Sequence, residues 1–488
     1  MGEILGNLKP ERMWNIFEEI VNIPRPSKHE TAIREYVMNF GKKIGLDTTM
    51  DEVGNIVIRK PATAGMENRK GVIFQGHLDM VPQANSDVKH DFTKDPIKPR
   101  IDGEWVKATG TTLGADNGIG VAATLAIMEA KDLKHGPLEA LFTTDEETGM
   151  TGAFGLKPDF LKGDILMNLD SEDEGELFIG CAGGTNANAT FKYKKADVPK
   201  KHTAFKIIVK GLKGGHSGCD IHLGRGNSNK ILFRFLKYGE NNFKLRLAKA
   251  EGGNLRNAIP REAFAIVVIP KDKVDEFNKA ISDYNMIVKK ELATAEPDLV
   301  VFAEKVKTPK SLIDKSTQRH LINAIYACPN EVIRMSNDMP GLVETSSNLA
   351  IVKFDEKAKK INVHCLLRSS VDSAKEALEE MMGCVFELAG AECTFDGQYP
   401  GWKPNPQSPI LVVMLDIYEK LFGKKPEIKA IHAGLECGLI GGIYPNFDMI
   451  SFGPTIKFPH SPDEQLNIET VQKFWDYLLE TLKNVPVK

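Results

Sequence analysis

The stretch GVIFQGHLDM, residues 71–80, decides the fold, because it joins a strand-like run to two side chains with chemical potential. The short apolar run GVIFQ predicts a buried strand. His77 and Asp79 follow it two positions apart, so on an extended segment both side chains point to the same side. The sequence therefore predicts a strand whose carboxyl end carries an imidazole and a carboxylate.

The same arrangement recurs at three other places along the chain. A strand-like run leads into acidic or histidine-containing residues in LEALFTTDEETG (138–149), ILMNLDSEDEG (165–175) and DMISFGPTIKFPHSPDE (448–464). Between the strand-like runs GVIFQ (71–75) and LEALFTT (138–144), the stretch GIGVAATLAIMEA (118–130) has helical spacing and composition. Such alternation predicts an α/β domain with a mixed, mostly parallel sheet flanked by helices.

The middle of the chain has a different pattern. Strand–helix–strand order appears over residues 204–270 and again over 347–398, without catalytic-looking carboxylates. Two such units predict an inserted α+β lid domain with an internal pseudo-repeat. With 488 residues, the chain also exceeds what one hydrophobic core usually organises. The predicted domains are a discontinuous catalytic domain at 1–188 and 403–488 and an inserted lid domain at 189–402.

Composition excludes several classes of partner and site. Lys and Arg total 63 against 66 Asp and Glu, a net charge of -3, which gives no electrostatic case for nucleic acid or an anionic membrane. The seven cysteines are scattered and never form a C-x-x-C pair, which argues against a disulfide framework or a thiolate zinc site. No apolar run approaches membrane-spanning length. A cytoplasmic protein is therefore expected.

The residues that follow these strands can form one site. In an open α/β sheet, the loops after the carboxyl ends of the strands line one edge. That edge would collect His77, Asp79, Glu146, Glu147, Asp170 and His460, and Asp116 of GTTLGADNGIG (110–120) can join it. Two histidines and three carboxylates are what two divalent ions need, and such ligands suit zinc, cobalt or manganese.

Two pairs of neighbouring residues suggest a division of labour. Asp79 can hold the imidazole of His77 through its second nitrogen. The side chains of Glu146 and Glu147 are expected to project differently, so that one can bind metal while the other acts as a general base. A two-metal site with its own base is suited to the hydrolysis of peptide bonds.

Taken together, these motifs resemble the metallopeptidase family that contains carnosinase, bacterial tripeptidase and glutamate carboxypeptidase. The resemblance rests on GHLDM, GADNG, TDEETG, NLDSEDEG, GGHSG (214–218) and FPHSPDE. Within that family the whole chain is similar to the bacterial aminoacyl-histidine dipeptidases, also called cytosolic non-specific dipeptidases. The closer match is carried by FQGHLDMVPQ, by the run from 90 to 120, by GLKGGHSG and by LRNAIPREAFA.

The resemblance assigns roles to individual residues. It implies that His77 and Asp170 hold one metal and that Glu147 and His460 hold the other. The carboxylate of Asp116 would bridge the two metals, and the Asp116–Asn117 peptide would be cis. It also implies that Asp79 orients His77 and that Glu146 is the base. His216 would stabilise the oxyanion, in its own subunit or across a dimer. Substrate recognition would involve Arg368 and Asn257 at the carboxylate, with His432 and Glu436 as further candidates.

Each motif alone has a simpler explanation. A histidine beside an aspartate is often a surface pair, adjacent glutamates are usually a solvated face, and Asp116 could merely cap a helix. The glycines of GADNG and GGHSG could serve only tight turns, Arg368 could form a structural ion pair and Asn257 a turn. Joint occurrence in succession after several strands favours a site.

The sequence thus predicts a dinuclear metallopeptidase that cleaves dipeptides with a free amino terminus, Xaa-His dipeptides included. Two divalent ions are expected, zinc first and manganese or cobalt as alternatives, and a homodimer is possible. An N-acyl amino acid amidohydrolase or a carboxypeptidase of the same family is the first alternative. A non-catalytic metal- or peptide-binding relative is the second, although a pure binder has no need for Glu146.

Overall fold

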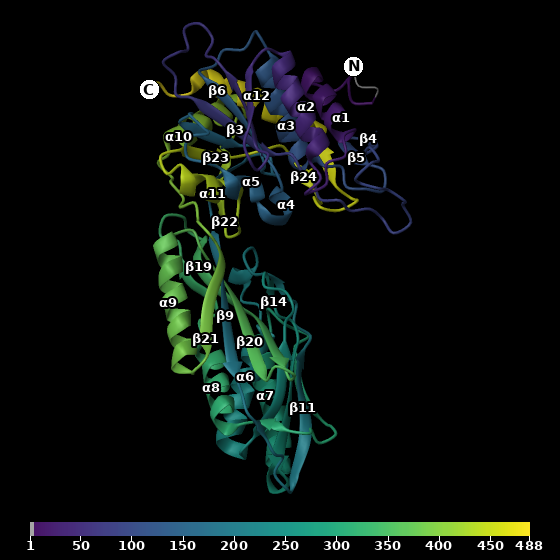
Figure 1. Cartoon of the computed structure of the whole chain (residues 1–488), viewed down its shortest axis with the longest axis vertical. Coiled ribbons are helices and arrows are strands. Elements are labelled where there is room, and N and C mark those ends of the chain that lie inside the picture. The colour runs from purple at the N-terminus through teal and green to yellow at the C-terminus, as the bar shows by residue number, and fades with distance from the viewer. Residues whose placement is uncertain (1–3) are drawn as a thin grey trace. The chain divides into compact units, whose positions relative to one another are not determined.

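The computed structural model describes residues 4–488, which form two compact units. The first unit contains the residues up to Gly180, then Pro404–Ala430 and Leu435–Lys488. The second contains Cys181–Lys403 and Ile431–Gly434. In Figure 1 the first unit accordingly combines purple and blue segments from early in the chain with yellow segments from its end.

The first unit is built on an eight-stranded sheet with the order β1-β2-β6-β3-β7-β23-β8-β22. The strands are β1 (Asp47–Met50), β2 (Ile56–Lys60), β6 (Leu138–Thr143), β3 (Val72–His77), β7 (Ile165–Asn168), β23 (Asp448–Ser451), β8 (Glu176–Cys181) and β22 (Glu427–Ile431). The four central strands, β6, β3, β7 and β23, run parallel. They are buried along their length, as near-continuous apolar runs are in parallel sheets. Their carboxyl ends therefore meet at one edge.

The first unit has eight helices among the described residues, of which α2, α3 and α10 contact the eight-stranded sheet most. They are α1 (Glu11–Val21), α2 (Thr31–Lys43), α3 (Ala115–Glu129), α4 (Glu146–Gly149), α5 (Thr151–Gly155), α10 (Pro409–Phe422), α11 (Glu436–Ile443) and α12 (Ile468–Asn484). Helix α3 packs on β3, β6 and α1, and its small and apolar residues are buried almost throughout. Helix α10 packs on β23 and α12, and begins where the Ser408 hydroxyl accepts from the amide of Leu411. The predicted helix at 118–130 is confirmed within α3.

A small four-stranded sheet belongs to the same unit. Its order is β24-β25-β5-β4, with β24 (Ile456–Lys457), β25 (Gln465–Asn467), β5 (Trp105–Ala108) and β4 (Pro99–Asp102). The loop between β24 and β25 contains His460. Pairing of β25 with β5 therefore fixes this loop to the part of the chain that precedes Asp116.

The second unit is built on a nine-stranded antiparallel sheet, ordered β16-β11-β15-β13-β19-β20-β9-β21 with β18 added beside β19. The strands are β9 (Gly183–Lys192), β11 (His202–Lys210), β13 (Arg246–Gly252), β15 (Ala263–Pro270), β16 (Val300–Lys305), β18 (Glu331–Met335), β19 (Val343–Asp355), β20 (Lys360–Ser369) and β21 (Glu392–Tyr399). Two short pairs accompany it: β10 (Lys195–Ala196) with β17 (Leu312–Ile313), and β12 (Gly215–His216) with β14 (Ala258–Ile259).

Four helices cover this sheet: α6 (Ser228–Phe243), α7 (Val274–Glu291), α8 (Lys315–Ala327) and α9 (Asp372–Leu388), with two short 3₁₀ turns at Ile221–Leu223 and Lys271–Lys273. Helix α9 packs along β9, β20 and β21, as Figure 1 shows, and α6 packs on β11, β15 and β13. One apolar core joins all four helices to one face of the sheet. The unit is thus α+β.

The predicted fold class is confirmed: one part has a mixed, largely parallel sheet flanked by helices, and the part inserted into it along the chain is α+β. Between 204 and 270 the structure adds β13, which the sequence analysis did not separate because charged residues interrupt its apolar pattern. The internal pseudo-repeat and the catalytic and lid roles of the two parts stay predictions.

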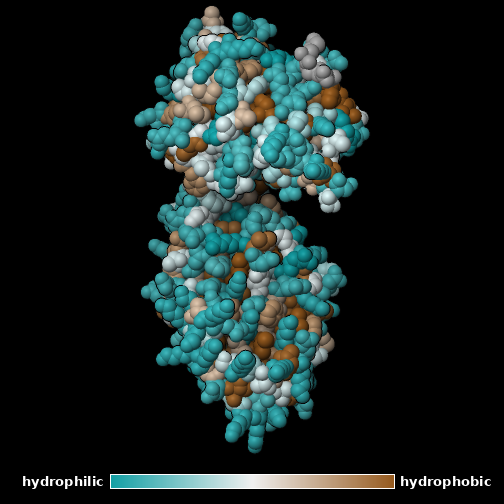
Figure 2. Space-filling view, turned by 45° about the vertical axis from the view of Figure 1, so that its right-hand side comes forward, coloured by the Kyte–Doolittle hydropathy of each residue, from teal (hydrophilic) through white to brown (hydrophobic). Residues whose placement is uncertain are grey.

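The surface gives little further indication of partners. The face shown in Figure 2 is mainly hydrophilic, with hydrophobic residues scattered among the polar ones. Within residues 4–488, none of the helices combines the length and the apolar composition that crossing a membrane would require.

Candidate metal centre

The predicted ligands meet at the carboxyl edge of the central strands of the first unit. His77 is the last residue of β3, and Asp170 lies two residues beyond the end of β7. Glu147 belongs to α4, which begins three residues after β6. Asp116 lies in the first turn of α3, and His460 in the loop after β24. The topology of a parallel sheet therefore places these distant segments together.

One group of ligands contains His77, Asp116 and Asp170, whose ligand atoms lie within 4.8 Å of one another. The Nε2 atom of His77 is 2.9 Å from Oδ1 of Asp116 and 3.2 Å from Oδ1 of Asp170. His77 is 1% exposed, and the two carboxylates are also largely buried. This geometry is that of a three-ligand metal subsite.

A second group contains Asp116, Glu147 and His460, again within 4.8 Å. The Nε2 atom of His460 is 3.0 Å from Oδ2 of Asp116 and 3.1 Å from Oε2 of Glu147. Asp116 thus presents one carboxylate oxygen to each histidine, which is the arrangement that a bridging ligand requires. The Asp116–Asn117 peptide is cis, as the resemblance implied.

Asp79 contacts the ring of His77 and is 0% exposed. Its Oδ1 is 3.3 Å from Nδ1 of His77, whose ring nitrogen is also 3.2 Å from the backbone oxygen of Asp79. The carboxylate accepts from the Ser27 hydroxyl at 2.8 Å and from the amides of Glu146 and Glu147 at 3.0 and 3.2 Å. Burial would raise the pKa of Asp79, but hydrogen bonding and the charge of His77 lower it to about 2. Asp79 therefore couples the His77 ring to the loop that carries both glutamates.

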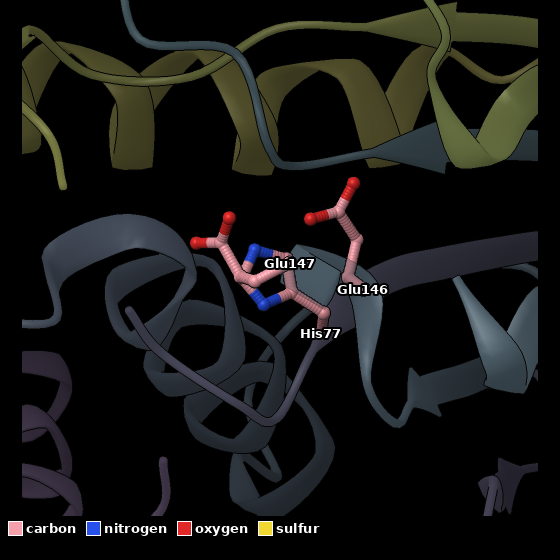
Figure 3. A group of neighbouring side chains, drawn as sticks. All are labelled: His77, Glu146 and Glu147. Carbon is pink, nitrogen blue, oxygen red and sulfur yellow. The ribbon is translucent and has the colours of Figure 1, made fainter. Parts of the chain in front are cut away.

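Glu146 and Glu147 diverge from adjacent backbone positions (Figure 3). The two glutamates begin the one-turn helix α4, where a simple passage from strand to loop could have been expected. The chain turns into this helix at Asp145, whose φ of 53° is in the left-handed region. Their carboxylate oxygens and a ring nitrogen of His77 lie within 4.8 Å. Burial raises the pKa of Glu146 well above its ordinary value, with nearby carboxylates adding to the effect. Of the two, Glu147 is the one that forms an ion pair with His460.

The concentrated charge shifts other groups in the centre. Hydrogen bonds to Asp116 and Glu147 raise the pKa of His460 to about 11. Burial would lower the pKa of His77, but the charge of Asp170 and the hydrogen bonds around the ring raise it well above 6.5. Burial raises the pKa of Asp170 to about 7. All three pKa shifts arise because carboxylates and imidazoles lie in contact with one another and are shielded from water.

The residues present fit a pair of divalent ions. Within residues 4–488, Oε1 of Glu147 is buried without a hydrogen-bond partner, and the buried Oδ1 of Asp170 has the ion pair with Nε2 of His77 but no further partner, although nearly all buried polar atoms in proteins are hydrogen-bonded. A cation placed among the ligands would satisfy both. The donor set is imidazole nitrogen and carboxylate oxygen without a thiolate, which suits zinc, manganese or cobalt.

A chain of buried polar side chains, not foreseen from the sequence, supports the strand ends. Oε2 of Glu436 accepts from Gln75 at 2.6 Å and from Thr143 at 2.7 Å. The amide of Asn168 donates to Gln75 at 2.5 Å, and the Ser451 hydroxyl donates to Asn168 at 2.5 Å. The chain thus links α11 to β6, β3, β7 and β23. Alternation along a buried strand gives no signal for such polar partners.

Glu436 is therefore placed near the centre but inside the protein. It is 1% exposed, and burial raises its pKa to about 7. Its Oε1 lacks a hydrogen-bond partner. Its predicted part in substrate recognition stays a prediction.

Glu464 is a second buried carboxylate that the sequence analysis did not single out. It is 2% exposed and accepts from four successive amides, those of residues 113–116, at 2.7 to 3.3 Å. Burial raises its pKa to about 7. Glu464 lies four residues after His460, so it ties the His460 loop to the Asp116 segment. Its position in the FPHSPDE motif can be read from the sequence, but its burial cannot.

The second unit brings together other predicted residues. His216 lies in β12, opposite Ala258 of β14, and the backbone oxygen of the exposed Asn257 accepts from the Ser217 amide at 2.8 Å. Nδ1 of His216 accepts from the amides of Gly218 and Cys219 at 3.2 and 3.1 Å. Burial and the charge of Arg368 lower the pKa of His216. The ring is therefore neutral and carries its hydrogen on Nε2.

Arg368 and His432 belong to the same unit. Arg368 of β20 is 5% exposed, its Nη1 donates to the Tyr399 hydroxyl at 3.1 Å, and its Nε lacks a partner. Nε2 of His432 lies 2.7 Å from the hydroxyl of Ser346, which pairs with Arg368 across the β19–β20 ladder. Burial and the charge of Arg368 lower the pKa of His432 to about 3. These side chains form a buried polar group with uncommitted donors.

Comparison with known proteins extends this description. The model of peptidase family M20/M25/M40 matches residues 73–484. The cytosol non-specific dipeptidase of Escherichia coli (strain K12) is 50% identical over 484 residues, which are 99% of either chain. The crystal structure of aminoacylhistidine dipeptidase from Vibrio alginolyticus has a TM-score of 0.96 at 51% identity, covering 99% of this chain and 98% of that one. Aminopeptidase PepT from Bacillus cereus ATCC 10987 shares the fold, with a TM-score of 0.57 at 16% identity over 98% of this chain and 99% of that one.

Proposed function

This chain belongs to peptidase family M20/M25/M40, and we propose that it hydrolyses dipeptides that carry a free amino terminus, Xaa-His dipeptides included. The observation that carries the proposal is the shared position of Asp116 between two three-residue ligand groups, with Glu146 beside them. Two full-length relatives, at 50% and 51% identity, are a non-specific dipeptidase and an aminoacylhistidine dipeptidase, and they support this substrate class.

Peptidases of this family use divalent metal ions, and the ligand set of this chain fits them. His77 and Asp170 are proposed to hold one ion, Glu147 and His460 the other, and Asp116 both. Zinc is the expected ion, with manganese or cobalt as alternatives, because imidazole and carboxylate accept all three. When bound, the two ions would acidify a water molecule and polarise the carbonyl of the peptide bond.

Glu146 is the proposed general base. It adjoins Glu147 and His77 but is not part of either ligand group that shares Asp116. In the reaction the water oxygen bonds to the carbonyl carbon while Glu146 takes the proton that the water loses. The carbon–nitrogen bond then breaks, and Glu146 returns that proton to the leaving nitrogen. Asp79 is proposed to keep the His77 ring oriented through this cycle.

The second unit is proposed to supply groups that bind the substrate. His216 carries a hydrogen on Nε2 and, as a neutral donor, is suited to stabilise the developing oxyanion, in its own subunit or across a homodimer. The planar fork of Arg368 suits the carboxylate of the substrate, with Asn257 assisting. His432 and Glu436 are proposed to assist recognition. Gripping both ends of the substrate would favour dipeptides, since a longer chain leaves one end unmatched.

The proposed domains follow from these roles. Residues 1–188 and 403–488 are proposed as the catalytic domain, although residues 1–3 lie outside those that the structure describes, and 189–402 are proposed as the lid. The two compact units divide at slightly different places, after Gly180 and after Lys403, and Ile431–Gly434 belong to the second unit. The word cytosol in the name of the Escherichia coli relative supports a cytoplasmic location for this chain.

The first test compares a dipeptide with its N-acetylated form on metal-loaded protein. Recognition of a free amine predicts hydrolysis of the dipeptide and little turnover of the blocked form. Preferred cleavage of the N-acetylated compound would instead favour an amidohydrolase or a carboxypeptidase. A panel that includes carnosine and other Xaa-His dipeptides, run with zinc, manganese and cobalt in turn, ranks substrates and metals. Absence of turnover across the whole panel would favour a non-catalytic binder.

A further inference from the structure

Arg25 is a buried charged side chain with no role in the reaction described above. It lies between α1 and α2 in the first unit and is 1% exposed. Within residues 4–488 its guanidinium donates to three backbone oxygens: Nη1 to Leu78 and Asp79 at 2.9 and 2.7 Å, and Nη2 to Gly114 at 2.5 Å. Fully buried arginines are rare unless they are paired, so this placement needs a reason.

The three carbonyls belong to the two segments that carry metal ligands. Leu78 and Asp79 directly follow His77, whereas Gly114 precedes Asp116 by two residues. One rigid, planar fork thus holds both segments at once, which a single ammonium group on a flexible stem cannot do with the same geometry. The neighbouring chain reinforces the contact, because the backbone oxygen of Arg25 accepts from the Met80 amide at 3.1 Å and Ser27 donates to Asp79.

The glycines of GADNG make room for this guanidinium. A Cβ atom added at Gly114 or at Gly118 would lie 2.7 Å from Nη2 of Arg25, closer than real Cβ contacts allow. Gly114 also has a φ of +73°, in the left-handed region that favours glycine. The GADNG motif contains the predicted metal ligand Asp116. Its glycines also leave the space that the guanidinium of Arg25 occupies, although Arg25 lies 89 residues before Gly114.

Carboxylates in and around the metal centre act on the charge of Arg25. Burial lowers the pKa of its guanidinium, and the charges of Asp79, Glu464, Asp116 and Glu147 oppose that shift. Its hydrogen bonds go to backbone oxygens and to none of these four carboxylates. Its positive charge therefore offsets the concentrated negative charge of the centre without competing for the oxygens that face the metal subsites.

We propose that Arg25 is a positioning residue that sets the separation between His77 and Asp116, and with it the geometry of the two metal subsites. This inference rests on the proposed two-metal function. It assigns Arg25 no contact with the substrate. Its effect appears in how tightly the centre holds its ions and in the geometry of the loaded centre, and through both in turnover.

The test measures metal binding directly. Metal-stripped wild type, Arg25→Lys and Gly118→Ala are titrated with zinc by calorimetry, and the unfolding midpoint of each metal-free protein is recorded. Arg25→Lys keeps the charge but loses the fork. Gly118→Ala keeps Arg25 and every ligand but displaces the guanidinium, so it remains informative if Arg25→Lys fails to fold. The control is Arg59→Lys, since the guanidinium of Arg59 also joins separate segments of the first unit, donating to the Phe160 carbonyl and to the Glu139 carboxylate.

We expect two ions per wild-type chain, and an affinity about 10- to 100-fold weaker in both test variants, the usual loss when a group that orients metal ligands is changed. Arg59→Lys should bind zinc as the wild type does. At saturating zinc the KM for a dipeptide should stay near the wild-type value while kcat falls. Wild-type zinc affinity in both Arg25→Lys and Gly118→Ala would overturn the inference while leaving the proposed function intact. A wild-type chain that binds no zinc would contradict the proposed function, and the inference with it.

Discussion

Replacing Asp79 by asparagine changes the residue that orients His77 and leaves all five proposed metal ligands in place. The carboxylate of Asp79 has two acceptor oxygens, which receive the Ser27 hydroxyl and the amides of Glu146 and Glu147, and Oδ1 lies 3.3 Å from Nδ1 of His77. Asparagine keeps one oxygen and turns the other into an NH₂ group. At least one buried donor must then face another donor.

The size of the effect follows from these contacts. A buried donor left without its acceptor costs about 1–3 kcal/mol. Loss of a carboxylate that orients a metal-bound histidine typically lowers metal affinity or activity about 10- to 100-fold. We therefore expect Asp79→Asn to bind the ion held by His77 and Asp170 about 10- to 100-fold less tightly and to turn over dipeptides more slowly even at saturating metal.

The assay is a competition titration of metal-stripped protein against a fluorescent zinc chelator, followed by steady-state hydrolysis at saturating zinc. The matched control is Asp51→Asn, because Asp51 also accepts three backbone amides and a side-chain amide in the first unit, but outside the metal centre. Asp51→Asn should lower stability without changing zinc affinity. If both variants bind zinc equally well, or if Asp79→Asn matches the wild type in affinity and kcat, the supporting role of Asp79 is refuted.

Three further predictions address other parts of the account. Glu146→Gln should lower kcat about 10²- to 10⁴-fold with two zinc ions still bound, and undiminished turnover would rule out its role as the base. Arg368→Lys should lower kcat/KM for dipeptides about 10- to 100-fold, because one charge-assisted bond of the fork is lost; an unchanged KM would argue against carboxylate binding. His432 has a folded-state pKa of about 3, below its ordinary 6.5, so the unfolded chain binds more protons between these values. The contribution of His432 to stability should therefore fall by about 1.4 kcal/mol per pH unit as the pH drops below 6.5, and the difference in denaturant stability between the wild type and His432→Asn should change with pH by that amount.

The central strands and the ligand positions could be predicted from sequence because both depend on local pattern. Apolar runs of strand length ending in GHLDM or TDEETG indicate a buried parallel strand and the side chains at its carboxyl edge. The same logic located Asp116, which precedes a helix of small and apolar residues. Parallel topology then required these segments to meet, whatever their separation along the chain.

The supporting residues could not be found in this way. Arg25 and Glu464 are charged residues in unremarkable loops, and only tertiary packing shows that both are buried against backbone groups of the Asp116 segment. Gln75 and Asn168 lie in strands whose apolar neighbours gave no reason to expect a buried polar chain. Strand β13 was missed because its charged residues interrupt the apolar pattern.

The most direct measurement of the central claim is a zinc titration of metal-stripped protein with hydrolysis of one free-amine dipeptide followed in parallel. The account predicts that wild-type activity rises to its maximum as two zinc ions bind per chain. It also predicts that Asp116→Asn, which weakens the ligand common to both groups, disturbs both binding events. Full activity with a single ion, or two undisturbed ions in Asp116→Asn, would contradict a dinuclear centre bridged by Asp116.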